Sequence, residues 1–150
     1  MRKFAILIVV IACIMLLPAM FFQRHAMACE LLPVLNYQQI IDGVFVEMED
    51  TDTSADRAKA ITGLIAAASE RMTDLYGAPA SKPRVVITSD VQKAASWGSN
   101  ETASMHRMPW RACIIIGPKG QNVDVIAHEW LHAEIQHRVG FFRFLQEIPV

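Results

Sequence analysis

The chain has no cluster of positive charge beyond its first three residues, no internal repeat and no low-complexity tract. Its 14 lysines and arginines are balanced by 15 aspartates and glutamates, which leaves a formal net charge of −1. Proteins that bind nucleic acids contact phosphates through patches of Lys and Arg, so this composition gives nucleic-acid binding no electrostatic basis. With 150 residues, the chain has room for one domain besides its N-terminal segment.

Cysteine is scarce, with three in the whole chain. Cys13 lies inside an apolar segment, which leaves Cys29 and Cys113 as the two that could meet. An oxidising compartment would allow them to form a disulfide. We favour the alternative that Cys113, in the run "CIII", is a small buried hydrophobic residue, because free cysteines are among the most buried residue types.

Charge is also missing from "FAILIVVIACIMLLPAMFF", the 19 residues from Phe4 to Phe22. A helix of that length can cross a hydrocarbon core of about 30 Å. The preceding Arg2 and Lys3 favour a cytoplasmic N-terminus. We therefore predict that residues 1–28 are a signal anchor or signal peptide. Residues 29–150 would form a domain outside the cytoplasm, either anchored to the membrane through this segment or secreted or periplasmic after cleavage.

The fate of this segment has three alternatives. The small residues "AMA" at 26–28 resemble a signal-peptidase site, with cleavage before Cys29. The apolar run is longer than the usual signal-peptide core of about 7–15 residues, which favours a retained anchor. A lipid on Cys29 is the third alternative, and it is disfavoured because Ala26 stands where a large aliphatic residue is expected.

The rest of the sequence alternates between strand-like and helix-like patterns. We expect strands at residues 37–50, 84–88 and 111–116, and helices at about 53–77, 90–95 and 123–138. Residues 31–36 are predicted to be a linker, and residues 97–110 a polar loop. This order indicates an α+β or α/β layout. We adopt α+β, with a small sheet and helices packed against it.

The last predicted helix contains "HEWLH", the motif H-E-x-x-H at His128, Glu129 and His132. Residues on a helix advance by about 100°, so His132 lies one turn after His128 and only about 40° around the axis. Two such imidazoles can bind one zinc ion at about 2.0–2.1 Å. Glu129 flanks the metal and can act as the general base. We predict that His128 and His132 are Zn²⁺ ligands and that Glu129 is catalytic. The alternative is two surface histidines beside an ion-pairing glutamate.

A catalytic zinc site uses three protein ligands, and the motif supplies two. His137 follows His128 by nine residues and faces the opposite side of the helix, about 180° away. The longer metzincin motif requires Gly at position 135 and His at 138, where this chain has Ile135 and Arg138, so that class is excluded. Glu147 is the remaining acidic candidate after the helix.

The stretch "HEWLHAEIQHRVG…FLQEIPV" resembles the bacterial membrane-anchored or exported peptidases of the gluzincin-like "peptidase MA" group. In that group the motif helix is followed by a loop and a segment of the form I-P-x-W-[FL]-x-E-G-L-A, whose Glu is the third zinc ligand. Here "EIPV", residues 147–150, matches the start of that segment. The resemblance therefore implies a zincin-like fold that lacks its C-terminal part, with the third ligand expected just past Val150.

Together, motif and resemblance predict a zinc-dependent metallopeptidase that hydrolyses peptide bonds in a peptide or protein substrate. If the chain ended at Val150, two histidines alone would bind zinc weakly and activity would be crippled. One alternative is a catalytically inactive, membrane-tethered remnant that binds a peptide or protein partner. Another is a structural zinc module that uses His128, His132 and Glu147.

The motif does not account for several other side chains, and two of them, His106 and Asp124, have two interpretations each. His106 either contacts substrate or stabilises an oxyanion, or it is a loop histidine without a role. Asp124 either orients a ligand histidine or caps the helix. Glu134 is expected to pair with Arg138 one turn later. Three tryptophans are predicted to pack rather than to bind substrate: Trp97, Trp110 and Trp130.

Overall fold

A computed structural model describes residues 24–35, 37–47 and 54–140 of the chain. Within these ranges no helix is both long and apolar enough to cross a membrane. The apolar run at residues 4–22 and the candidate ligand Glu147 lie outside the described residues.

The described strands form one five-stranded mixed sheet in the order β1-β2-β3-β5-β4. The three central strands are parallel, and an antiparallel strand lies at each edge. The strands are β1 (Tyr37–Ile41), β2 (Val44–Glu47), β3 (Arg84–Ile87), β4 (Ala103–Arg107) and β5 (Ala112–Ile116). With four α-helices in the described residues, this sheet confirms the expected α+β class.

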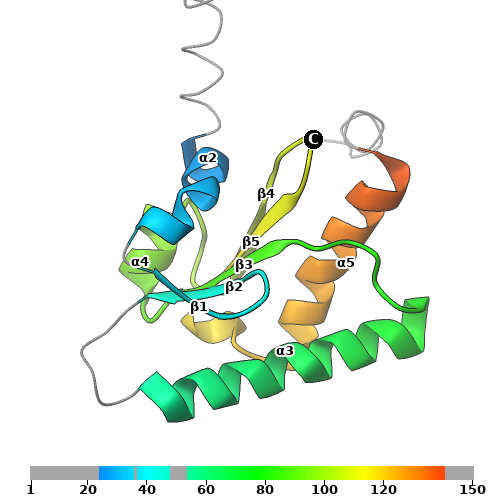
Figure 1. Cartoon of the computed structure of the whole chain (residues 1–150), viewed down its shortest axis with the longest axis horizontal. Coiled ribbons are helices and arrows are strands. Elements are labelled where there is room, and N and C mark those ends of the chain that lie inside the picture. The colour runs from blue at the N-terminus through cyan, green and yellow to red at the C-terminus, as the bar shows by residue number, and fades with distance from the viewer. Residues whose placement is uncertain (1–23, 36, 48–53, 141–150) are drawn as a thin grey trace, which may run out of the picture.

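Helices cover both faces of the sheet (Figure 1). They are α2 (Arg24–Glu30), α3 (Ser54–Tyr76), α4 (Val91–Ser96) and α5 (Val123–Val139). The two long helices, α3 and α5, pack on one face, where Ile61 and Ile126 join an aliphatic core. On the other face, Cys29 at the end of α2 packs with Trp97. Successive residues of a strand point to opposite faces, so a strand such as β3 contributes to both cores.

Two predicted helix starts are confirmed, because local side chains fix them. The side chain of Asn122 accepts a hydrogen bond from the backbone N–H of Val125 at 3.0 Å and caps α5. Asp90 caps α4 in the same way, accepting from the N–H of Lys93 at 2.8 Å. These bonds satisfy N–H groups that have no partner within the helix.

One strand prediction and one loop prediction were wrong. The segment 37–50 was expected to be one strand, but β1 and β2 form a hairpin that turns between Ile41 and Val44. Gly43 makes this turn possible because its φ of 77° lies in the region that side chains disfavour. The predicted loop over 97–110 contains the edge strand β4, which pairs with β5.

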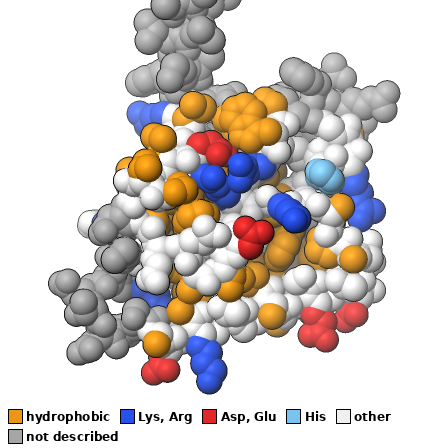
Figure 2. Space-filling view, in the orientation of Figure 1, with side chains coloured by type: hydrophobic (Ala, Val, Ile, Leu, Met, Phe, Trp, Pro, Cys, Tyr) orange, Lys and Arg blue, Asp and Glu red, His pale blue; other side chains and the backbone are white. Residues whose placement is uncertain are grey.

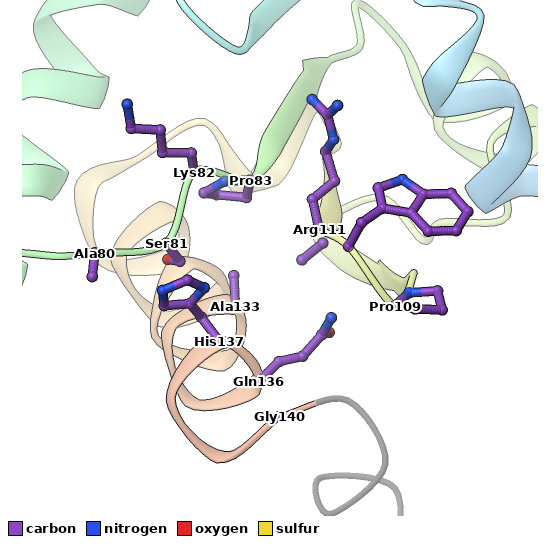
Figure 3. Close-up of a pocket in the computed structure, with 12 residues that line it drawn as sticks. Ala80, Ser81, Lys82, Pro83, Pro109, Arg111, Ala133, Gln136, His137 and Gly140 are labelled. Atoms are coloured by element: carbon purple, nitrogen blue, oxygen red, sulfur yellow. The ribbon is translucent and has the colours of Figure 1, made fainter.

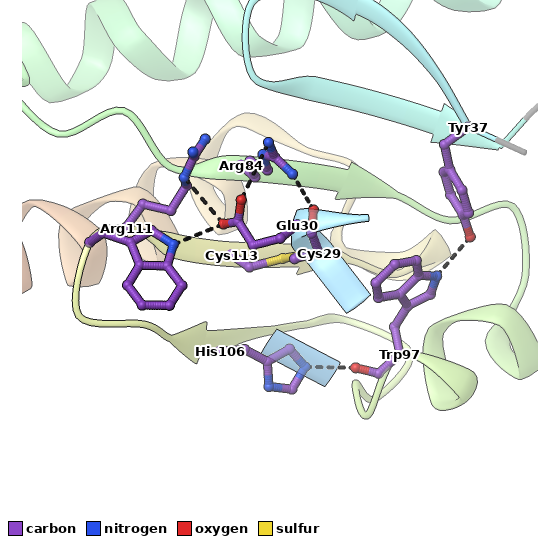
Figure 4. Close-up of a disulfide and its surroundings, with 9 residues drawn as sticks. Cys29, Glu30, Tyr37, Arg84, Trp97, His106, Arg111 and Cys113 are labelled. Atoms are coloured by element: carbon purple, nitrogen blue, oxygen red, sulfur yellow. Dashed lines mark hydrogen bonds and ion pairs between the residues drawn. A yellow bond between two sulfur atoms is a disulfide. The ribbon is translucent and has the colours of Figure 1, made fainter. Parts of the chain in front are cut away.

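The preferred interpretation of Cys113 was also wrong. Cys113 is buried, as expected, but it forms a disulfide with Cys29, with the two Cα atoms 6.4 Å apart (Figure 4). This bond joins α2 to β5 across the second core. It also uses the sulfur atom of Cys29, so this atom is not available to carry a lipid.

The carboxylate of Glu30, next to that disulfide, contacts three side chains (Figure 4). It lies 3.4 Å from a guanidinium nitrogen of Arg84 and 3.3 Å from one of Arg111. It also accepts a hydrogen bond from the indole N–H of Trp110 at 3.1 Å. The segment 31–36, predicted to be a linker, includes Leu32, whose side chain is fully buried in the same core. Leu32 therefore anchors this segment to the domain.

Glu134 of α5 holds the loop between α3 and β3. The residue is only 2% exposed, and its carboxylate accepts hydrogen bonds from the backbone N–H groups of Ala80 and Ser81. Arg138 donates to it at 2.6 Å, which confirms the predicted pair. Burial by itself would raise the pKa of Glu134, but these donors outweigh burial and lower the pKa to about 2.

We expect Glu134→Gln to destabilise the full chain by roughly 3 kcal/mol at pH 7, because the donors around residue 134 favour a carboxylate. The folded pKa of about 2 lies below the ordinary 4.5. The stabilisation is therefore complete above about pH 5 and disappears as the pH falls towards 2. Urea unfolding followed by circular dichroism at pH 7 and pH 3 measures this. Glu70→Gln, on the exposed side of α3, is the control and should change stability by less than about 0.5 kcal/mol. An equal loss at both pH values would contradict the assignment.

Candidate metal site on helix α5

The helix α5 presents His128 and His132 side by side, as their spacing predicts. Their Nε2 atoms lie 3.1 Å apart, and the two rings stand nearly perpendicular, with centroids 4.7 Å apart. Both Nε2 atoms thus converge on one point beside the helix. Glu129, the residue between them in the motif, is half-buried on the same helix.

This geometry fits a shared zinc ion. Two nitrogen ligands at about 2.0–2.1 Å from a tetrahedral zinc are roughly 3.3 Å apart. The observed separation of 3.1 Å between the Nε2 atoms of His128 and His132 is close to that value. The same separation is also that of a hydrogen bond between the two rings, which holds the pair together without a metal.

The edge strand β4 contacts α5 and brings one charged side chain to its side of the sheet. Met105 packs against the core that α5 shares, and Arg107, two residues later, points to the same face. His106 points to the opposite face, where its Nε2 lies 2.6 Å from the carbonyl oxygen of Trp97 and its ring stacks on His25. His106 therefore faces away from the histidine pair, which contradicts a role in substrate or oxyanion contact there.

The surroundings of His132 favour its neutral form. Burial lowers the pKa of His132 first, and the charges of His128 and Arg107 lower it further, while Glu129 opposes them. Zinc binds the neutral imidazole, so a lowered pKa reduces competition from protons. His128 is more exposed and leaves the metal position open to solvent.

A third ligand is not found among residues 24–35, 37–47 and 54–140, where no group of three His, Cys, Asp or Glu side chains could hold a metal. His137 is exposed and lies around the helix from the pair, as predicted. Asp124 lies 3.2 Å from Arg71 of α3, so its carboxylate pairs with a cation. That pairing favours neither the role of orienting a ligand nor that of capping the helix.

A shallow groove of about 160 Å³ lies beside His128, between the C-terminal half of α3 and the first turns of α5. Its apolar lining includes Met72, Leu75, Tyr76 and Leu131, and Leu75 and Tyr76 are more than half exposed. An apolar surface thus adjoins the candidate metal position.

The three tryptophans differ in how far they are buried. Trp97 is buried and donates a hydrogen bond to the hydroxyl of Tyr37 at 2.7 Å, which confirms that it packs. Trp130 packs against the core under α5, as predicted. Trp110 was expected to pack, but 60% of its surface is exposed.

No protein-family model, no curated protein and no solved structure matches this chain. The motif, its resemblance and the geometry of α5 are therefore the basis for a functional proposal.

We expect His128→Ala or His132→Ala to weaken Zn²⁺ binding by the full chain at least about tenfold, because each removes one of two converging nitrogens. Competition against a chromogenic zinc indicator measures the affinity. His137→Ala is the matched control, since His137 is a histidine of the same helix on another face, and it should bind zinc like the wild type. Equal losses in all three variants would show that zinc binds elsewhere.

Proposed function

We propose that this chain is the motif-bearing part of a gluzincin-like zinc metallopeptidase that hydrolyses peptide or protein substrates. The observation that carries the proposal is the convergence of the Nε2 atoms of His128 and His132 at 3.1 Å on α5, with Glu129 beside them. The α+β architecture, with α5 packed under a small sheet, is compatible with the zincin-like fold that the motif resemblance implies.

Each residue of the site has a defined part in this mechanism. His128 and His132 would hold the zinc ion, which when bound polarises a peptide carbonyl and acidifies a water molecule. Glu129 would accept a proton from the attacking water and pass it to the nitrogen of the leaving amine. Arg107, on the α5 side of β4, would place positive charge where the carbonyl oxygen becomes negative. The identity of the third ligand, for which Glu147 is a candidate, stays a prediction.

The proposed location is outside the cytoplasm, with the N-terminal segment as membrane anchor or export signal. The disulfide between Cys29 and Cys113 supports this, because structural disulfides persist mainly in oxidising compartments. A reduced, cytoplasmic chain would lack the covalent link between α2 and β5.

The competing proposal is a catalytically inactive remnant that binds a peptide or protein partner. The solvent-open histidine pair and the adjoining apolar groove are compatible with binding as well as with turnover. Only a measurement of zinc-dependent hydrolysis separates the two.

We expect Glu129→Gln to lower kcat for a quenched fluorescent peptide library by at least about 100-fold, because it removes the proton acceptor. Zinc affinity should stay within about twofold, since Glu129 is not a ligand. The control is Glu70→Gln, the same chemical change on the exposed side of α3, which should leave both quantities unchanged.

The outcomes have distinct meanings. Hydrolysis by the Glu129→Gln variant at the wild-type rate would contradict the assignment of Glu129 as general base. A wild-type protein that binds zinc and peptide but does not cleave any library member would favour the inactive remnant.

A further inference from the structure

A second cavity, larger than the groove beside His128, lies near the C-terminal end of α5 (Figure 3). It has a volume of about 440 Å³ and is enclosed by three segments: the loop at 80–83, residues 109–112 and the last turns of α5. That volume lies within the usual range for binding sites of small ligands. His137, which lines the cavity, lies about 180° around the helix from His128. The cavity and the metal site are therefore separate.

Two cationic side chains, those of Lys82 and Arg111, line this cavity. Figure 2 shows Lys and Arg side chains gathered in the middle of one face of the molecule, with acidic side chains beside them. Arg111 shares the carboxylate of Glu30 with Arg84, so that single acid faces two guanidinium groups. Lys82 makes no ion pair with any of the described residues. The net positive charge favours an anionic ligand.

One buried acceptor of the cavity wall has no hydrogen-bond partner among the described residues. Gln136 is 5% exposed, and its Nε2 donates to the carbonyl oxygen of Met108 at 2.8 Å. That bond fixes the orientation of the amide, and Oε1 is left unpaired. Figure 3 shows the side chain of Gln136 projecting from α5 towards the segment that carries Pro109 and Arg111. Buried acceptors are normally paired, so a ligand with an N–H group would complete this one.

An apolar surface completes the cavity. Its lining includes Trp110, Pro109, Pro83 and Ala133. Figure 3 shows Pro109 across the cavity from Pro83 and Ala133. Trp110 is 60% exposed yet held in place by its hydrogen bond to Glu30. A fixed, exposed tryptophan provides a large contact area at little entropic cost, which is why tryptophan is enriched at binding surfaces.

We propose that this cavity binds the C-terminal end of a peptide. Lys82 and Arg111 attract the terminal carboxylate, Oε1 of Gln136 accepts the hydrogen bond of a backbone N–H, and the last side chain packs on Trp110. A peptide terminus combines the three features that complement the cavity: negative charge, an N–H donor and an apolar group. Inorganic phosphate offers the charge but no apolar group.

The test uses the full chain, freed of metal with a chelator, so that peptide hydrolysis and binding at the histidine pair through a metal are both eliminated. The probes are acetyl-Ala-Ala-Phe with a free carboxylate and the same peptide with a C-terminal amide. Binding is followed by tryptophan fluorescence, because Trp110 is far more exposed than Trp97. We expect the free acid to bind at least about tenfold more tightly than the amide, since charge-assisted hydrogen bonds are stronger than neutral ones.

Two matched variants locate the site. Lys82→Met should weaken binding of the free acid about tenfold, which corresponds to the loss of one charge-assisted contact. Lys59→Met makes the same change on the exposed side of α3 and should bind like the wild type. Equal affinity for acid and amide, or equal behaviour of the two variants, would overturn the proposal. So would competition by inorganic phosphate as strong as that of the peptide, which would indicate a general anion site. Because zinc is absent throughout, failure of this test leaves the proposed hydrolase unaffected.

Discussion

The buried carboxylate of Glu134 connects the parts of this domain that position both candidate sites. It accepts hydrogen bonds from the backbone at Ala80 and Ser81, and from Arg138 on its own helix. The loop after α3 is therefore fixed against α5, and β3 begins directly after that loop. A single charged group, buried but fully paired, thus ties α5 to the loop that leads into β3. Unpaired, the same carboxylate would oppose folding.

Much of the fold could be predicted from local signals. The caps at Asp90 and Asn122 are properties of a few neighbouring residues, so the helices that they start were placed correctly. The strand β4 was missed because all five of its residues are half-buried and three of them are polar, so this edge strand shows little hydrophobic contrast. The Asp42–Gly43 pair was a hairpin signal that could have divided segment 37–50 into two strands.

The candidate site was predictable to the extent that it lies on one helix. The relation between His128 and His132 follows from the 3.6-residue period alone. The position of Arg107 on the α5 side of the sheet could not be predicted. It depends on which strand lies beside α5 and on the face of that strand to which each side chain points. His106 and Arg107 are neighbours in sequence, yet they serve opposite sides of the sheet. Long-range pairings of this kind, like that of Cys29 with Cys113, have no local signal in a single sequence.

The disulfide has a consequence for how the chain matures. Its two cysteines are separated by 84 residues, so α2 leaves the ribosome long before its partner strand exists. Cys29 can therefore be joined to its native partner only after β5 has been synthesised. The cross-link is a late event in biogenesis, and its formation reports that the sheet has already assembled.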